Sequence, residues 1–87
     1  MFGLATSFQL FPNPAFNEVK LSWKANAEGM LELNLINMTG LECLRRSFNM
    51  KSESARISLS DIRDGIYWFN IYLGDNCLHR GKLVICR

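Results

Sequence analysis

Apolar and polar residues alternate along most of this chain, a pattern that is typical of half-buried β-strands. Val19, Leu21 and Trp23 alternate with charged or polar residues, and the same alternation returns at 31–35 and 55–59. No segment shows the sustained period of a helix. The alternation therefore predicts a chain that is built almost entirely from short strands.

The segment 66–73 carries the strongest strand pattern. Apolar side chains occupy both alternate sets of its positions, and Trp68 and Tyr72 share one of the two faces. We therefore expect this strand to be central in its sheet or covered on both sides. The continuous apolar run at 83–85 indicates a last strand whose two faces are both at least partly covered.

Glycine and asparagine interrupt the predicted strands where the chain has to turn. Asn37–Gly40 has Asn at its first position and Gly at its fourth, as a type I turn prefers. We expect further turns at Asn26–Gly29 and Gly74–Asn76, each of which would join two neighbouring strands as a hairpin. Asp61–Gly65 is predicted to form one helical turn, which Gly65 would end in the left-handed conformation.

The spacing of the strands indicates the fold class. Pro12 and Pro14 cannot lie in a central strand, so they predict a bend after a first strand at 8–11. Together with this first strand, the chain has about seven predicted strands at a spacing of roughly 8–12 residues. This predicts an all-β domain, an immunoglobulin-like antiparallel β-sandwich, over residues 8–87, with residues 1–7 as a linker or an expression remnant. The following residues are predicted to be mostly buried: Trp23, Leu33, Ile57, Tyr67, Phe69 and Ile71.

Composition and charge narrow the possible functions. The chain has 87 residues, of which 48% are hydrophobic, so it suits a single core and is too apolar for a disordered tail. The formal net charge of only +2 disfavours a nucleic-acid partner. No apolar run approaches the roughly 20 residues of a membrane-spanning helix. The basic residues of the fourth and last strands are interpreted as solvated strand faces: Arg45, Arg46, Arg80, Lys82 and Arg87.

No group of side chains predicts catalysis, a cofactor or a metal site. His79 is the only histidine, and we expect it to face solvent from a strand, with no nucleophile or orienting partner. Cys43, Cys77 and Cys86 are odd in number, so we expect three small buried apolar side chains rather than a disulfide framework. Cys77 and His79 are the only closely spaced pair of zinc-ligand types, and two further ligands are missing. The sequence therefore predicts a protein that is not an enzyme.

Trp68 and Tyr72 leave one binding function open. Two aromatic side chains on one face of a strand can form a platform for sugars, as in a carbohydrate-binding module. They can instead cover the second side of the sandwich, and we favour this second interpretation. An exposed aromatic pair together with measurable glycan binding would favour the platform.

Several short motifs, taken in order, resemble the type IX (Por) secretion C-terminal sorting domains of Bacteroidota. Phe11–Ala15, followed by the strand at 18–21, is similar to the "YPNP" box and the first long strand of that family. Asn37–Gly40 matches the turn that ends an apolar strand, and 59–69 resembles the "L-x-x-G-x-Y" segment with a longer spacing. The chain closes on a segment that is similar to the terminal "GKLVVxK", and the resemblance covers residues 10–87. Phe11 stands where Tyr is commoner, and the three cysteines are unusual for the family.

The resemblance implies a secretion and sorting signal that performs no chemistry. Such domains direct a parent protein from the periplasm through the type IX translocon, and a sortase-like peptidase then removes the domain at the cell surface. Cleavage is expected N-terminal to Phe11. The implied recognition residues are Lys82, Leu83, Val84, Ile85, Cys86 and Arg87, and the implied domain-start motif is Phe11, Pro12, Asn13 and Pro14. Gly40 and Gly65 are expected to be structural turn residues.

Two points about the ends of the chain accompany this interpretation. A terminal strand offers main-chain groups and a carboxylate that a receptor can bind. Residues 1–11 lack the basic start and the cleavage site of a secretory signal, so that signal is expected outside this chain. An immunoglobulin- or fibronectin-like spacer would have the same fold, and it differs from a sorting domain in that it can be internal to its parent protein.

Overall fold

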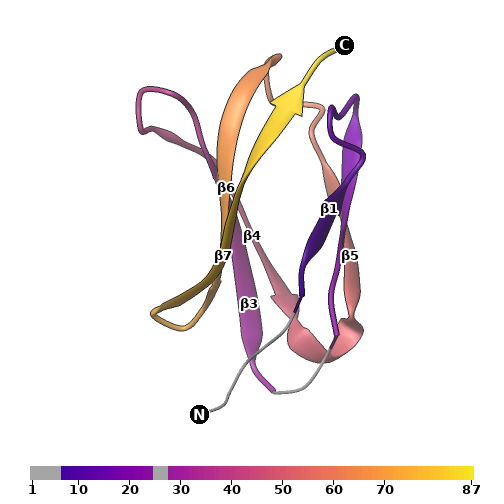
Figure 1. Ribbon diagram of the computed structural model, residues 1–87, viewed down its shortest axis with the longest axis vertical. Coiled ribbons are helices and arrows are strands. Elements are labelled where there is room, and N and C mark those ends of the chain that lie inside the picture. The colour runs from indigo at the N-terminus through magenta and orange to yellow at the C-terminus, as the bar shows by residue number, and fades with distance from the viewer. Residues whose placement is uncertain (1–6, 25–27) are drawn as a thin grey trace.

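The computed structural model describes residues 7–24 and 28–87, and these form seven strands and one short 3-10 helix (Figure 1). The elements in chain order are β1 (Gln9–Phe11), β2 (Glu18–Ser22), β3 (Met30–Ile36), β4 (Glu42–Asn49), η1 (Met50–Ser52), β5 (Ser54–Ser58), β6 (Gly65–Leu73) and β7 (Asn76–Ile85). The count and the positions of the strands confirm the prediction from the alternation of apolar and polar residues.

The strands form two antiparallel sheets that face each other (Figure 1). One sheet has three strands in the order β1-β2-β5, and the other has four strands in the order β4-β3-β6-β7. The chain changes sheet between β2 and β3, between β4 and β5, and between β5 and β6. Such crossings are typical of immunoglobulin-like sandwiches, so the predicted fold class is confirmed.

The predicted hairpin between β2 and β3 is wrong. β2 pairs with β1 and β5, whereas β3 pairs with β4 and β6, so the segment around Asn26–Gly29 connects the two sheets. Residues 25–27 of that segment lie outside the described residues. The alternation of side chains shows which face of a strand is buried, but it carries no information about the neighbouring strand.

Two of the predicted turns join neighbouring strands as expected. In Asn37–Gly40 the Gly40 amide donates to the Asn37 carbonyl at 3.0 Å, and Gly40 has a φ of 89°. The Asn37 side-chain oxygen also accepts from the Leu41 amide at 2.9 Å, which closes the connection between β3 and β4. Gly74, with a φ of 62°, lies in the hairpin between β6 and β7.

The corner before β6 differs from the predicted helical turn. The Ile62 amide donates to the Leu59 carbonyl at 2.9 Å, so the chain makes a single β-turn there. Gly65 has the predicted positive φ, but at 157° it is the first residue of β6 and does not form a left-handed helix stop. The Tyr67 hydroxyl donates to the Arg63 carbonyl at 2.6 Å, as in the tyrosine corner of immunoglobulin-like domains. Burial raises the pKa of this tyrosine.

The core lies between the two sheets. All six residues that were predicted to be buried are buried: Trp23, Leu33, Ile57, Tyr67, Phe69 and Ile71. The sequence analysis missed Met50 in η1, which is fully buried and whose carbonyl accepts from the Trp23 indole at 2.7 Å. Gly81 of β7 lies against the Phe69 ring, and a Cβ atom there would come within 2.6 Å of two ring carbons. This position therefore requires glycine for a close approach.

Candidate recognition site

The two end motifs that the sequence analysis singled out lie against each other. The Asn13 side-chain amide donates to the Lys82 carbonyl at 2.8 Å, and the Val84 amide donates to the Asn13 side-chain oxygen at 3.0 Å. The Asn13 side chain thus makes the two hydrogen bonds that a neighbouring strand would make with β7. The peptide bonds before Pro12 and Pro14 are both cis.

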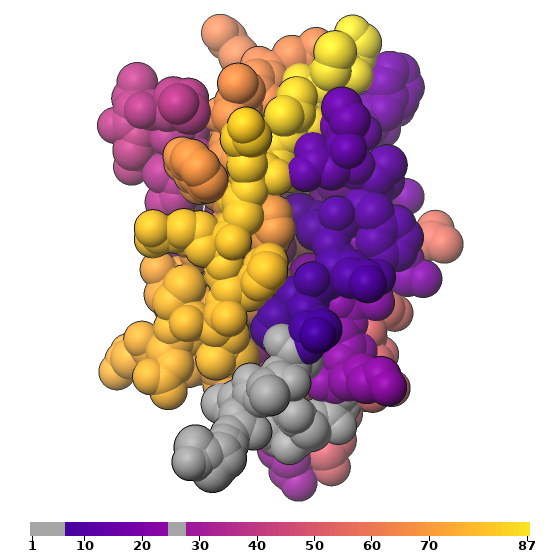
Figure 2. All heavy atoms as spheres, viewed as in Figure 1, coloured from indigo at the N-terminus to yellow at the C-terminus, as the bar shows by residue number. Residues whose placement is uncertain are grey.

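Ala15 continues this pairing along β7. Its amide donates to the Val84 carbonyl at 2.7 Å, and its carbonyl accepts from the Cys86 amide at 2.9 Å, which makes a parallel bridge to Ile85. We call the segment Asn13–Ala15 with these four hydrogen bonds the clasp. Figure 2 shows residues near the start of the domain, in indigo and purple, in contact with the yellow end of the chain.

The clasp corrects one expectation about the terminal strand. Because Asn13 and Ala15 bond to β7 from Lys82 to Cys86, the main-chain groups on that edge are already paired. A receptor cannot add a further strand there while the clasp is in place. The main chain of the terminal segment is therefore not the free surface that the sequence analysis expected.

Arg87 is also held by the fold, which corrects the expectation of a solvated residue. Its guanidinium donates to the carbonyls of Leu59 and Ile62 at the corner before β6. It also forms an ion pair with Asp64 at 2.8 Å and donates to the Asn17 side chain at 3.3 Å. The side chain is only 26% exposed. Hydrogen bonds from the Arg87 amide and side chain lower the pKa of the Asp64 carboxyl.

The remaining candidate recognition residues divide by the alternation of β7. Leu83 and Ile85 are buried in the core, at 0% and 1% exposure. Lys82 and Cys86 are exposed, and Val84 is half-buried on the same side as Lys82. Only the alternate residues of the predicted recognition segment therefore present side chains to a partner.

The outer face of the four-stranded sheet carries an aromatic groove that no other element within residues 7–24 and 28–87 covers. Trp68 is 42% exposed, so the expectation that Trp68 and Tyr72 cover a second side of the sandwich is wrong, although β6 is central in its sheet as predicted. A groove of about 300 Å³ lies on this face. It is lined by Ile36, Trp68, Asn70, Tyr72 and Arg80.

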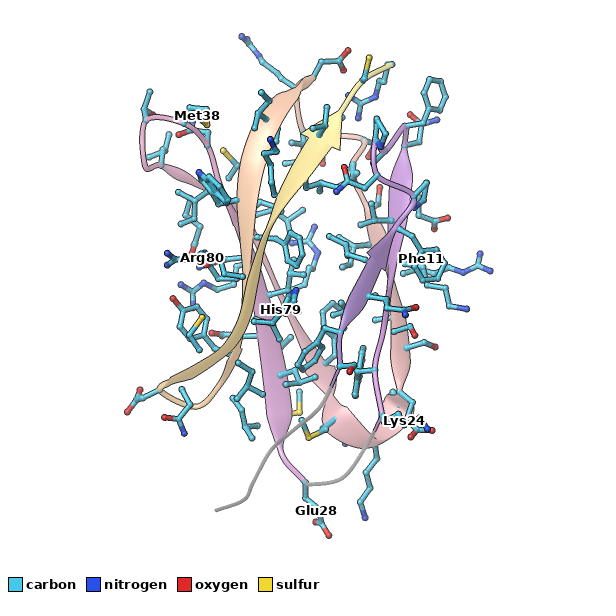
Figure 3. All side chains as sticks on the ribbon, in the orientation of Figure 1. Phe11, Lys24, Glu28, Met38, His79 and Arg80 are labelled. Atoms are coloured by element: carbon cyan, nitrogen blue, oxygen red, sulfur yellow. The ribbon has the colours of Figure 1, made fainter. Side chains whose placement is uncertain are left out.

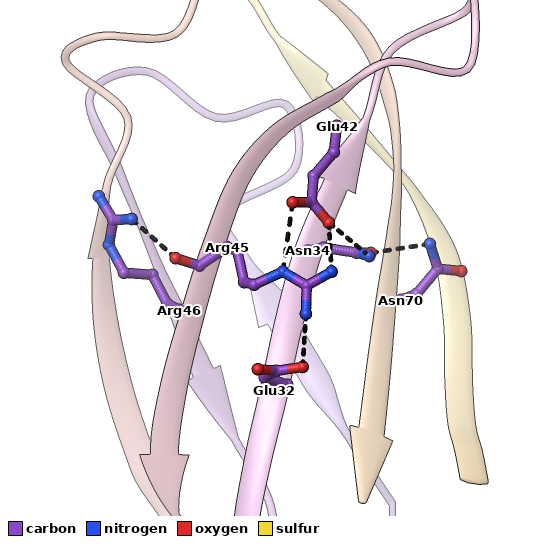
Figure 4. A network of polar contacts seen from close by, with 6 residues as sticks. All are labelled: Glu32, Asn34, Glu42, Arg45, Arg46 and Asn70. Carbon is purple, nitrogen blue, oxygen red and sulfur yellow. Dashed lines mark hydrogen bonds and ion pairs between the residues drawn. The ribbon is translucent and has the colours of Figure 1, made fainter. Parts of the chain in front are cut away.

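A chain of polar side chains crosses this face from β4 to β7 and was missed by the sequence analysis. Figure 4 shows its part from Glu42 to Asn70. Asn34 donates to Glu42 at 3.2 Å and accepts from Asn70 at 2.9 Å. Asn70 in turn accepts from the Arg80 Nε at 2.7 Å. The two asparagines are buried, and every buried side-chain nitrogen and oxygen among the described residues has a partner. We call these four residues the polar ladder.

Arg45 links Glu42, the acidic end of the polar ladder, to Glu32. It forms ion pairs with Glu32 at 2.8 Å and with Glu42 at 2.7 Å (Figure 4). The hydrogen bond from Arg45 lowers the pKa of the Glu42 carboxyl. At the other end, in β7, Arg80 points away from the sandwich (Figure 3), and it forms no ion pair with any other described residue.

The histidine and the cysteines differ from the expectations, and they form no chemical site. His79 points between the sheets (Figure 3), where its ring lies 5.9 Å from the Phe8 ring and 5.6 Å from the Phe69 ring. Cys77 and Cys86 are exposed rather than buried, and Cys43 is half-buried. Over the described ranges 7–24 and 28–87, no three His, Cys, Asp or Glu residues gather as a metal site would require.

Comparisons with known proteins assign the family. The described residues contain no helix that is long and apolar enough to span a membrane. No curated protein matches the chain. The family model of the secretion system C-terminal sorting domain matches residues 9–86, nearly the whole chain. This family comprises sorting signals and not catalysts. The motif match and the seven-stranded sandwich agree with it, and the chain belongs to the type IX secretion C-terminal sorting domains.

Proposed function

We propose that this domain directs a parent protein across the periplasm, through the type IX translocon, to the cell surface. The observation that carries the proposal is the match to the sorting-domain family over residues 9–86. The clasp supports it, because it joins the start motif and the end motif of the family in one structural unit. The domain acts as a ligand of the export machinery and as a substrate of a sortase-like peptidase.

Within this function we assign different roles to alternate residues of the end segment. Leu83 and Ile85 fill the core, and Arg87 fastens the end of the chain to the corner before β6. Lys82, Val84 and Cys86 are then the side chains that the translocon contacts. The clasp positions them through the hydrogen bonds of Asn13 and Ala15. Cleavage falls N-terminal to the domain-start motif, Phe11 to Pro14, so that the domain leaves as one folded unit.

A reporter fusion tests the function. A fluorescent protein with its own secretory signal is joined to the N-terminal side of this domain and expressed in a bacterial host that carries a type IX system. We expect the reporter at the cell surface or in the medium, and in the periplasm when the translocon is deleted. If the fusion stays in the periplasm of the complete host as the reporter alone does, the proposed function is wrong.

The exposed groove around Trp68 favours a second candidate function, carbohydrate binding. An exposed tryptophan beside polar side chains can stack on a sugar ring. The polar ladder disfavours it, because the Asn70 amide donates to Asn34 and accepts from Arg80, and is therefore engaged within the protein. Titration of the domain with a soluble oligosaccharide separates the two functions, since a sorting domain does not require sugar binding.

A further inference from the structure

We propose that the outer surface of β6 and β7 docks on a protein of the export machinery, through an apolar pocket on that protein that is bordered by acidic side chains. The surface, which we call the outer patch, consists of Ile66, Trp68, Arg80, Lys82 and Val84. This inference rests on the proposed function and extends it, because it assigns the partner a chemistry and adds residues outside the end segment.

The register of β6 and β7 places the residues of the outer patch next to one another. Trp68 lies directly opposite Lys82, and Ile66 lies directly opposite Val84. Residues in such opposite positions on one face contact each other. The exposed Lys82 and the half-buried Val84 are therefore continuous with two exposed apolar side chains, since Ile66 is 43% and Trp68 is 42% exposed.

The apolar part of the outer patch has the properties of an interface centre. Exposed tryptophan is uncommon on a surface without a binding role, and tryptophan is enriched among the residues that dominate protein–protein affinity. Trp68 also stands over the groove and beside Ile36. A partner that encloses the indole would bury a large apolar area at one point.

The charge of the outer patch indicates the charge of the partner surface that it fits. Lys82 and Arg80 form no ion pair with any other described residue, whereas the nearby acids Glu32 and Glu42 are both paired with Arg45. Strands β6 and β7 contain no acidic residue, so the outer patch itself carries only the positive charges of Arg80 and Lys82. A complementary partner presents acidic side chains around the pocket for Trp68.

The other modes of recognition fit less well. The edge of β7 is occupied by the clasp, so strand addition at residues 82–86 would first have to displace Asn13 and Ala15. Sugar hydroxyls need acceptors as well as donors, and the charged groups of the outer patch are donors only. Docking through side chains on the sheet face needs no change in the fold.

The apolar part of the proposal is tested by Trp68→Ala in the reporter fusion. We expect at least a fivefold loss of surface reporter. The matched control is Leu41→Ala, which removes another exposed apolar side chain, 65% exposed, from the β3–β4 loop, and should export as the wild type does. Equal export of Trp68→Ala and wild type overturns the inference and leaves the proposed function standing, because the latter fails only if the wild-type fusion is not exported.

The charge of the partner is tested at Val84 by two substitutions of similar length. Val84→Glu places a carboxylate in the middle of the outer patch and should reduce surface reporter at least fivefold through repulsion. Val84→Lys loses the same packing against Ile66 but keeps the positive charge, and should retain most of the export. Equal loss in both variants contradicts an acidic partner.

The two tryptophans allow the fold and the sugar alternative to be checked in one spectrum. The indole N–H signals of ¹⁵N-labelled domain report on Trp23, which is buried and bonded to Met50, and on Trp68, which is exposed. In the variants at Val84 the Trp23 signal should stay in place if the core is intact.

Titration of the wild type with cellohexaose and with polygalacturonate fragments should move neither signal. A saturable shift of the Trp68 signal alone would overturn the protein-docking assignment in favour of a sugar ligand.

Discussion

The inner and the outer face of the four-stranded sheet are built from the same strands but serve different purposes. On the inner face, Leu33, Leu35 and Ile71 are at most 1% exposed and pack into one core. On the outer face, Asn34 and Asn70 belong to the polar ladder, and the aromatic groove is open to solvent. Adjacent residues of one strand are thus divided between the core and the surface that we propose for recognition. In β7 this separation runs through the end segment itself.

The largest expected difference between the two faces is the loss of folding stability caused by a substitution on the inner side of β7. Ile85→Ala removes a side chain that is 1% exposed, and we expect the free energy of unfolding to fall by about 2–5 kcal/mol. Val84→Ala, its neighbour on the outer face, is the matched control and should cost less than about 1 kcal/mol. Urea denaturation followed by tryptophan fluorescence measures both. Similar losses in the two variants would contradict the division of β7 into two faces.

Arg87 should come next in the size of its effect. Arg87→Ala removes the hydrogen bonds to the carbonyls of Leu59 and Ile62, and we expect the domain to lose about 1–3 kcal/mol of stability. Arg87→Lys should recover little of this loss, because an ammonium cannot reproduce the forked geometry of the guanidinium. Thermal unfolding of the two variants provides the measurement. A lysine variant as stable as the wild type would show that charge alone fastens the terminus.

The polar ladder on the outer face can be tested with a double variant. Asn70→Leu leaves the Asn34 side-chain oxygen without the donor that it has at 2.9 Å, and should destabilise the domain by about 1–2 kcal/mol. Asn34→Leu combined with Asn70→Leu removes both partners and should be less destabilising than the sum of the two single variants. Additive losses in denaturant titrations would mean that the two amides contribute independently.

The smallest expected effect is the pH dependence that Asp64 contributes. Hydrogen bonds from Arg87 hold the pKa of this carboxyl below its ordinary value of 3.8 in the folded protein. The folded state therefore gains stability above the ordinary pKa, and this gain is lost as the pH falls through the lowered value. Asp64→Asn should melt below the wild type near neutral pH, and the two melting temperatures should converge as the pH falls below the ordinary value. If the difference between the two melting temperatures does not change with pH, the stabilisation comes from the packing of the Asp64 side chain and not from its charge.

Much of the fold could be predicted from the sequence, because the period of the side chains shows directly which residues face the core. The six predicted core residues and the Asn37–Gly40 turn follow from such local patterns. The pairing of the strands could not be predicted in this way, because period-2 alternation is the same whichever strand lies alongside. The hairpin expected at Asn26–Gly29 failed for this reason.

The candidate site was less predictable, because its contacts join distant parts of the chain. Asn13 bonds to Lys82 and Val84, and Arg87 bonds to the corner before β6, and neither contact leaves a local pattern. The positions of His79 and Cys86 did have a signal. Both follow from the alternation that starts at Ile85, but the continuous apolar run at 83–85 hides which of its residues face inward.

The central claim is that the export machinery contacts the outward side chains of the end segment while the inward ones hold the fold. The most direct test is the export of the reporter fusion carrying Lys82→Glu, compared with Lys20→Glu, which reverses an exposed lysine of β2 in the other sheet. Both variants should remain folded, since each changes an exposed strand residue. The account predicts at least a fivefold loss of surface reporter for Lys82→Glu and wild-type export for Lys20→Glu. Wild-type export of a folded Lys82→Glu domain would contradict it.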